Sequence, residues 1–229
     1  MTFRRIFALA GAIAALGLIA SASALGAGTS VSVRIEGLKR TLLPATVTQT
    51  NAGSITKGGA PAGSCSATTA AGALDVATGH RWDGKYSSGL GIEISQIFDE
   101  THTYSPHGYY WSIFVDDHYA TAGICALKLH RGEQLLFAPY PAKGTVFPIV
   151  LKAPRTATAG KPFRVKAFYY RGKGNASKPI AGVTFTGVAG ATNRQGIATL
   201  TARKSGKLTL VGSDQGYVRS AVTTVKVGG

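Results

Sequence analysis

Cysteine, methionine, acidic residues and long apolar runs are all scarce in this chain. Its 229 residues include two cysteines, one methionine and ten Asp or Glu, against 25 Lys or Arg. After residue 24, no stretch approaches the roughly 18 apolar residues that a transmembrane helix needs. The sequence also lacks a Walker-type phosphate loop and a Gly-x-Ser-x-Gly nucleophile turn. These absences exclude a transmembrane helix after residue 24 and argue against an enzyme.

The first 24 residues have the three-part layout of a secretory signal peptide. Arg4 and Arg5 form a positive start, residues 6–20 an apolar stretch, and Ala22-Ser23-Ala24 a small-residue cleavage site. We therefore predict a signal peptide at 1–24 and a secreted or extracellular protein. Any association with the cell surface would be non-covalent.

The two cysteines, Cys65 and Cys125, form an even pair in a chain that we expect to reach an oxidising compartment. Such a pair favours a disulfide over a metal or redox site. Because the closed loop is long, the bond would stabilise the fold by about 4 kcal/mol.

Charge is distributed unevenly along the mature chain. Residues 25–143 hold nine basic and nine acidic residues, whereas residues 144–229 hold fourteen basic residues and a single acid, Asp214. A shift this sharp, next to the Pro141 to Gly144 segment, indicates a domain boundary. We predict one domain at 25–143 and a second, strongly basic domain at 144–229.

The first domain alternates strand patterns with one helical pattern. Residues 31–48 are typical of a hairpin, and residues 91–98 and 109–115 alternate as strands. Between the hairpin and the 91–98 strand, residues 66–78 have alanines and Leu74 at helical spacing, with a serine that can cap the N-terminus of the helix. This order predicts an α+β domain in which the helix packs across a mixed sheet.

Four sequence blocks of this domain resemble the transcobalamin-like C-terminal domain family, over about residues 31–139. They are Cys65 to Ala77, Tyr109 to Val115, Tyr119 to Cys125 and Gly132 to Phe137. The resemblance implies a β-grasp-like fold, which vertebrate relatives use to close over cobalamin. The helical domain that completes cobalamin binding in those relatives is missing from this sequence, so we predict no bound cofactor.

The second domain shows six or seven short alternating strands at nearly regular spacing, which predicts an all-β sandwich. Residues 181–210 are similar to bacterial immunoglobulin-like domains, which serve mostly as spacers and adhesive modules. The candidate polyanion contacts are Arg164, Lys166, Arg171, Lys173 and Lys178. The alternative interpretation is that these charges only keep the domain soluble.

Two clusters carry groups that acid–base or metal chemistry would need. Asp99-Glu100 lies near His102 and His107, and Asp116-Asp117 precedes His118. Neither cluster has the spacing of a known catalytic pair or zinc site, so we interpret both as solvated loops and predict no catalytic and no metal residue.

Four aromatic residues are candidates for a ligand surface. Tyr110 and Trp111 lie on the 109–115 strand, and Trp82 and Tyr86 precede the 91–98 strand. Trp111 fits core packing at least as well, whereas Tyr110, Trp82 and Tyr86 are expected to be more exposed.

The leading prediction is a secreted, non-enzymatic binding or adhesion-type protein, held near anionic cell-envelope polymers by its basic domain. The second hypothesis is an extracellular protein that binds a small molecule, a corrinoid or a glycan, against the aromatic strand. An extracellular hydrolase is third. Specific nucleic-acid binding is not expected.

Overall fold

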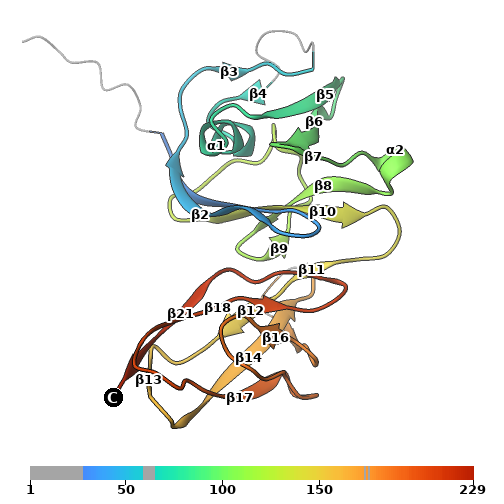
Figure 1. Ribbon diagram of the computed structural model, residues 1–229. Helices are drawn as coiled ribbons and strands as arrows, with labels where there is room; N and C mark the ends of the chain where they lie inside the picture. The colour runs from blue at the N-terminus through green and yellow to red at the C-terminus, as the bar shows by residue number, and fades with distance from the viewer. Residues whose placement is uncertain (1–27, 59–64, 173, 175) are drawn as a thin grey trace, which may run out of the picture.

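The computed structural model describes residues 28–58, 65–172, 174 and 176–229. The predicted signal peptide and Lys173 therefore lie outside the described residues. Two stacked parts are visible in Figure 1, with residues 28–141 above and residues 147–229 below. In the part of the chain that the structure describes, no helix is long and apolar enough to cross a membrane.

The first part is built on a five-stranded sheet with the order β2-β1-β10-β8-β9. β1 pairs with β10 in parallel, and the other neighbours are antiparallel. Alternation along β1 turns Val31, Val33 and Ile35 inward, where they join Leu135 and Phe137 of β10 in one core. The strands span Thr41–Gln49 (β2), Ser30–Glu36 (β1), Gln134–Pro141 (β10), Tyr109–Val115 (β8) and His118–Tyr119 (β9).

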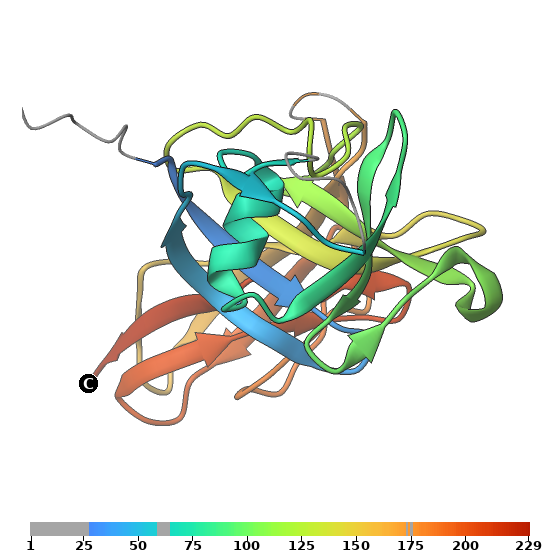
Figure 2. The same cartoon turned by 90° about the horizontal axis from the view of Figure 1, so that it is seen from above.

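One helix and a set of short strands cover the core face of this sheet. The helix, α1 (Ala70–Ala77), lies across the strands, as Figures 1 and 2 show. Beside it the sheet β5-β6-β7 and the pair β3-β4 complete the layer. Their bounds are Trp82–Ser87 (β5), Gly91–Ile97 (β6), Glu100–Thr101 (β7), Ser54–Ile55 (β3) and Cys65–Ser66 (β4), and the short α2 spans Tyr104–His107.

The predicted fold class, an α+β β-grasp-like domain followed by an immunoglobulin-like sandwich, is wrong. The described chain is mostly strand, arranged in many small sheets, and the fold is all-β and sandwich-like. The helical pattern at 66–78 yields only the eight residues of α1, too few to form a layer. Because strands rather than helices cover the rest of the core face, the first part is itself a β structure.

The second part is a set of facing small sheets around its own core. The largest has β12 on one edge of β14 and β15 and β17 one after the other along its opposite edge, and the next joins β13, β21 and β18. Alternation along β14 buries Phe163, Val165 and Ala167, which pack with Leu210 and Val225. The strands are Phe147–Pro148 (β11), Val150–Lys152 (β12), Thr156–Thr158 (β13), Pro162–Tyr170 (β14), Ser177–Pro179 (β15), Thr184–Phe185 (β16), Ile197–Thr201 (β17), Gly206–Leu210 (β18), Gly212–Ser213 (β19), Tyr217–Val218 (β20) and Thr223–Gly228 (β21).

A buried ion cluster and an apolar cluster join the two parts. Glu36 of β1 is only 1% exposed; it accepts hydrogen bonds from Arg34 Nη1 (2.8 Å) and from Arg219 Nε of the second part (2.9 Å). Arg34 also donates to the Arg219 carbonyl at 2.8 Å. The apolar cluster beside it contains Phe114, Leu136, Ala138 and Val218, with Tyr140 and Val146 packed against it.

Candidate binding surfaces

The predicted aromatic ligand surface does not exist as a unit. Trp111 is 6% exposed and Trp82 4%, so both belong to the core of the first part, and the expectation that Trp82 faces solvent is wrong. Trp82 is held there because its Nε1 donates to Asp75 Oδ1 at 2.8 Å. Tyr86 packs half-buried against the same core, and Tyr110 is half-buried at the surface.

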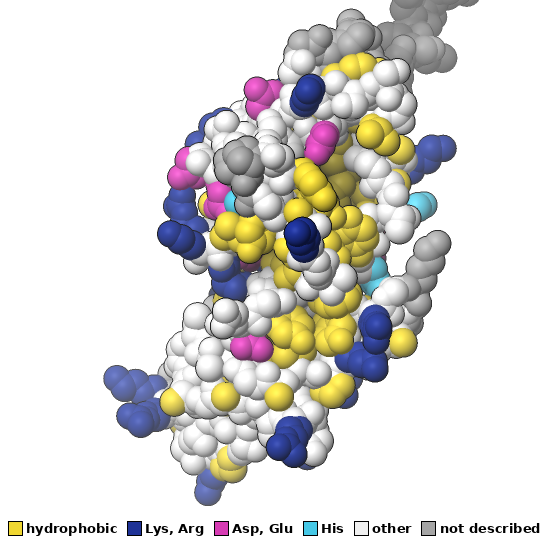
Figure 3. All heavy atoms as spheres, turned by 90° about the vertical axis from the view of Figure 1, so that its right-hand side faces the viewer, with side chains coloured by type: hydrophobic (Ala, Val, Ile, Leu, Met, Phe, Trp, Pro, Cys, Tyr) yellow, Lys and Arg dark blue, Asp and Glu magenta, His cyan; other side chains and the backbone are white. Residues whose placement is uncertain are grey.

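Tyr110 belongs instead to a cluster of tyrosines near the boundary between the two parts. Its ring lies 5.5 Å from that of Tyr140 and 6.5 Å from that of Tyr104, and Tyr119 lies 5.0 Å from Tyr140. Burial, together with the Tyr119 hydroxyl, raises the pKa of Tyr110 above its ordinary value. Figure 3 shows hydrophobic side chains gathered in this region on one face of the molecule.

The first of the two predicted acid–base clusters, around Asp99 and Glu100, makes contacts with neighbouring segments of the first part. His102 is buried, not solvated as predicted, and its Nε2 lies 2.6 Å from Glu100 Oε1, which also accepts the Leu38 N–H at 2.7 Å. Asp99 is exposed and pairs with Arg40. The side chain of His107 lies outside the described residues. Among those described, no three His, Cys, Asp or Glu side chains are grouped to hold a metal.

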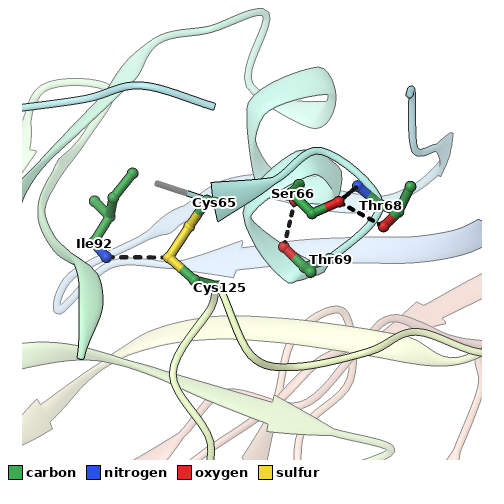
Figure 4. Close-up of a disulfide and its surroundings, with 6 residues drawn as sticks. All are labelled: Cys65, Ser66, Thr68, Thr69, Ile92 and Cys125. Atoms are coloured by element: carbon green, nitrogen blue, oxygen red, sulfur yellow. Dashed lines mark hydrogen bonds between the residues drawn. A yellow bond between two sulfur atoms is a disulfide. The ribbon is translucent and has the colours of Figure 1, made fainter. Parts of the chain in front are cut away.

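The predicted disulfide between Cys65 and Cys125 is confirmed. Figure 4 shows it beside α1, where the Ile92 N–H donates to Cys125 Sγ at 3.1 Å. Gly91 has a positive φ of 80°, and a β-carbon there would lie 2.5 Å from Cys125 Sγ. The disulfide joins β4 to the segment around Cys125, and the Ile92 hydrogen bond and the absence of a β-carbon at Gly91 let β6 lie against the same segment.

One face of β14 is basic and aromatic. Arg164 and Lys166 are exposed between inward residues, as predicted, and Phe168 and Tyr170 continue the same face. Lys152 of β12 pairs directly with Lys166. Neither β14 nor the strands β12, β15 and β17 beside it carries an acidic residue.

The other predicted polyanion contacts lie elsewhere. Lys178 pairs with Tyr169, so the register places it on the face of β14 opposite Lys166. Arg171 follows the end of β14 and is exposed. Lys173 is among the residues that are not described. Among the predicted contacts that the structure describes, Lys178 therefore lies on a different face from Arg164 and Lys166.

A cationic cleft adjoins the Arg164 end of this face. It has a volume of about 700 Å³, and its lining includes Arg203, Lys204 and Lys207 together with Thr199, Thr201 and Ser205. No carboxylate lines it. Thr199 pairs with Arg164, so the cleft and the basic face of β14 are continuous. The sequence signal was the Arg-Lys-Ser-Gly-Lys run at 203–207, which we did not single out.

A second cleft, of about 620 Å³, lies between the two parts. Leu38, Tyr109, Pro139 and Pro141 line it from the first part. Ser213, Asp214, Tyr217 and Arg219 are among the residues that line it from the second part.

No family model and no curated protein matches this chain. Among solved structures, the chain is similar to a proposed metal-binding protein of Ruminococcus gnavus ATCC 29149, with 13% identity and a TM-score of 0.36. The match covers 50% of this chain and 99% of that protein. A likeness of this size assigns neither a fold nor a ligand to the chain.

The two clefts differ in the ligands that they can accept. Three cations with neighbouring hydroxyls can bind phosphate, sulfate or carboxylate groups through charge-assisted hydrogen bonds. The cleft between the two parts is of a size typical of small-molecule sites, which often lie at such boundaries.

Proposed function

We propose that this chain is a secreted, non-enzymatic binding protein of adhesion type, whose second part attaches to anionic polymers of a cell envelope. One observation carries the proposal: Arg203, Lys204 and Lys207 line a cleft without a carboxylate, and the cleft continues onto the basic face of β14. A linear polyanion could contact the cleft and Arg164 together.

The physical character of this surface indicates which ligands it favours. Flexible Lys and Arg side chains around an open cleft attract repeated negative charges but define little geometry, so binding would be salt-sensitive and weakly selective. Phe168 and Tyr170 add apolar contact on the same face. Teichoic acids, acidic polysaccharides and lipopolysaccharide phosphates share these features.

Export of the protein is part of the proposal. The layout of residues 1–24 supports it, and so does the disulfide, since such bonds persist mainly in oxidising compartments. The membership of the first part in the transcobalamin-like family stays a prediction. The second hypothesis, a corrinoid or glycan bound against β8, loses one of its contacts because Trp111 is buried.

The test is the salt concentration at which the protein leaves a heparin column, together with the salt dependence of its affinity for a single-stranded oligonucleotide as a flexible polyphosphate. The variant R203A/K204A/K207A should elute at clearly lower salt. Its log–log salt slope should fall by about 2, since each lost phosphate contact on a single strand is worth roughly 0.7.

The control variant K161A/K178A/R194A removes the same charge from three exposed positions outside the cleft. It should elute close to the unmodified protein. If the two variants shift equally, only net charge matters and the cleft is not a binding site.

A further inference from the structure

The cleft between the two parts holds the one acidic residue of the second part. Residues 144–229 contain fourteen Lys or Arg and a single acidic residue, Asp214. Yet among the ion pairs of the described residues, Asp214 takes part in none. Within the described part of the chain, its carboxylate accepts a hydrogen bond from the neighbouring Gln215 N–H alone, at 2.9 Å. A half-buried carboxylate without a cation, in so basic a setting, is available to a ligand.

Aromatic rings lie next to this carboxylate. Tyr217 lines the cleft beside Asp214, and burial, Tyr169 and the charge of Asp214 raise its pKa, so the hydroxyl stays neutral. The ring of Tyr169 lies 5.8 Å from that of Tyr217. Tyr109 lines the cleft from the first part. Aromatic faces attract organic cations, and a carboxylate beside them adds to that attraction.

The remaining walls favour a cation that is weakly hydrated. Leu38, Pro139, Pro141 and Val146 provide apolar lining, which accepts methyl groups but not a strongly hydrated primary ammonium. Arg219 is the only basic residue of the lining. Its Nε donates to Glu36, which Arg34 shares, and its Nη2 donates to the Gly37 carbonyl at 2.7 Å. The Glu36 carboxylate therefore partly offsets the charge of Arg219 and holds its guanidinium toward the first part.

The cleft is also preformed. The buried ions of Arg34, Glu36 and Arg219 fix its two sides relative to each other, and the apolar cluster around Phe114 and Val218 packs beside them. A preformed site does not have to order its walls when the ligand binds, which favours affinity.

We propose that the cleft between the two parts binds the alkylated ammonium group of a ligand, with Asp214 as its counter-charge and Tyr217 and Tyr109 as its aromatic walls. This site is independent of the polyanion surface. Its charge preference is opposite, so a polymer that carries both phosphate and alkylated ammonium groups could contact both.

The test uses choline and its uncharged carbon isostere, 3,3-dimethyl-1-butanol, titrated into the full-length mature protein and followed by NMR shifts of residues 213–217. Choline should produce saturable shifts, and the isostere should bind roughly fivefold or more weakly, which is the Coulomb contribution of one ion pair near water. Ethanolamine, a primary ammonium, should also bind more weakly than choline.

Two variants locate the site. Asp214→Asn should weaken choline binding by a similar factor and leave binding of the isostere unchanged. Tyr217→Leu should also weaken choline binding. Tyr217→Phe, which keeps the aromatic ring, should not. The proposal would be overturned if the isostere or ethanolamine bound as tightly as choline, or if choline produced no saturable shifts. Elution from heparin reports the other surface, so the two proposals can fail separately.

Discussion

At the scale of single residues, the turn between β8 and β9 places two successive non-glycine residues in a disfavoured backbone conformation. Asp116 and Asp117 are its two central residues, and both have positive φ, 48° and 63°. Turns of this type favour Asn-Gly, because residues with a β-carbon are strained in the left-handed region. Asp116 has a compensating role, since its Oδ1 accepts the Gln134 N–H at 3.0 Å. Among the described residues, the Asp117 carboxyl accepts no backbone N–H in this way. Burial raises the pKa of this carboxyl.

We therefore expect Asp117→Gly to raise the free energy of unfolding by about 1 kcal/mol, because glycine relieves the backbone strain. Urea unfolding at neutral pH measures the change. The same substitution at Asp83, on β5 and without positive φ, should lower the stability instead. A stability loss at both positions would contradict this account of the turn.

At the scale of elements, α1 depends on a segment far along the chain. The helix begins after Thr69, later than the predicted start at residue 66. The N–H groups of Ala70 and Ala71, at its first turn, donate to the carbonyls of Leu127 and Ile124. These carbonyls replace the expected serine cap, and the disulfide at Cys125 holds their segment in place.

Removing the disulfide should therefore destabilise the first part strongly. Cys65→Ala/Cys125→Ala is expected to lose about 4 kcal/mol, since it frees a loop of 60 residues in the unfolded chain. Denaturant unfolding with and without a thiol reductant measures it. Reductant should lower the free energy of unfolding of the unmodified protein to nearly that of the variant, and it should not change the value for the variant. If reductant destabilised the variant as well, the loss would not come from this bond.

At the scale of the whole molecule, the ion cluster of Arg34, Glu36 and Arg219 couples the two parts. Thr41 Oγ1 also donates to Glu36, at 2.9 Å, so both carboxylate oxygens are satisfied. Fully satisfied buried ions contribute little net stability, but losing one partner leaves the others uncompensated. The geometry of the cleft between the parts rests on this arrangement.

Glu36→Ala should lower the free energy of unfolding by roughly 3 to 5 kcal/mol, because two arginines lose their buried partner. Arg40→Ala is the matched control: its ion pair with Asp99 is exposed on both sides, so it should cost less than about 1 kcal/mol. Both are measured by denaturant unfolding. Equal effects would show that the cluster does not couple the parts.

The candidate surfaces were predictable only where the signal was local. Alternation in β14 indicated that Arg164 and Lys166 face outward, and the structure agrees. Nothing local indicated that Lys178 would pair onto the other face, or that Arg203, Lys204 and Lys207 would line a cleft with Thr199. Those placements depend on strand register and on the β17–β18 turn.

By itself, the sequence determined the uneven charge of the two halves, the cysteine pair and the inward faces of β1 and β14, because composition and alternation are local properties. The tertiary structure was needed to show that short strands beside one helix cover the first sheet, that Glu36 meets Arg219 across 183 positions, and that Asp214 lines a cleft. These outcomes depend on which distant segments pack together, and that choice minimises the free energy of the whole chain rather than of any one stretch.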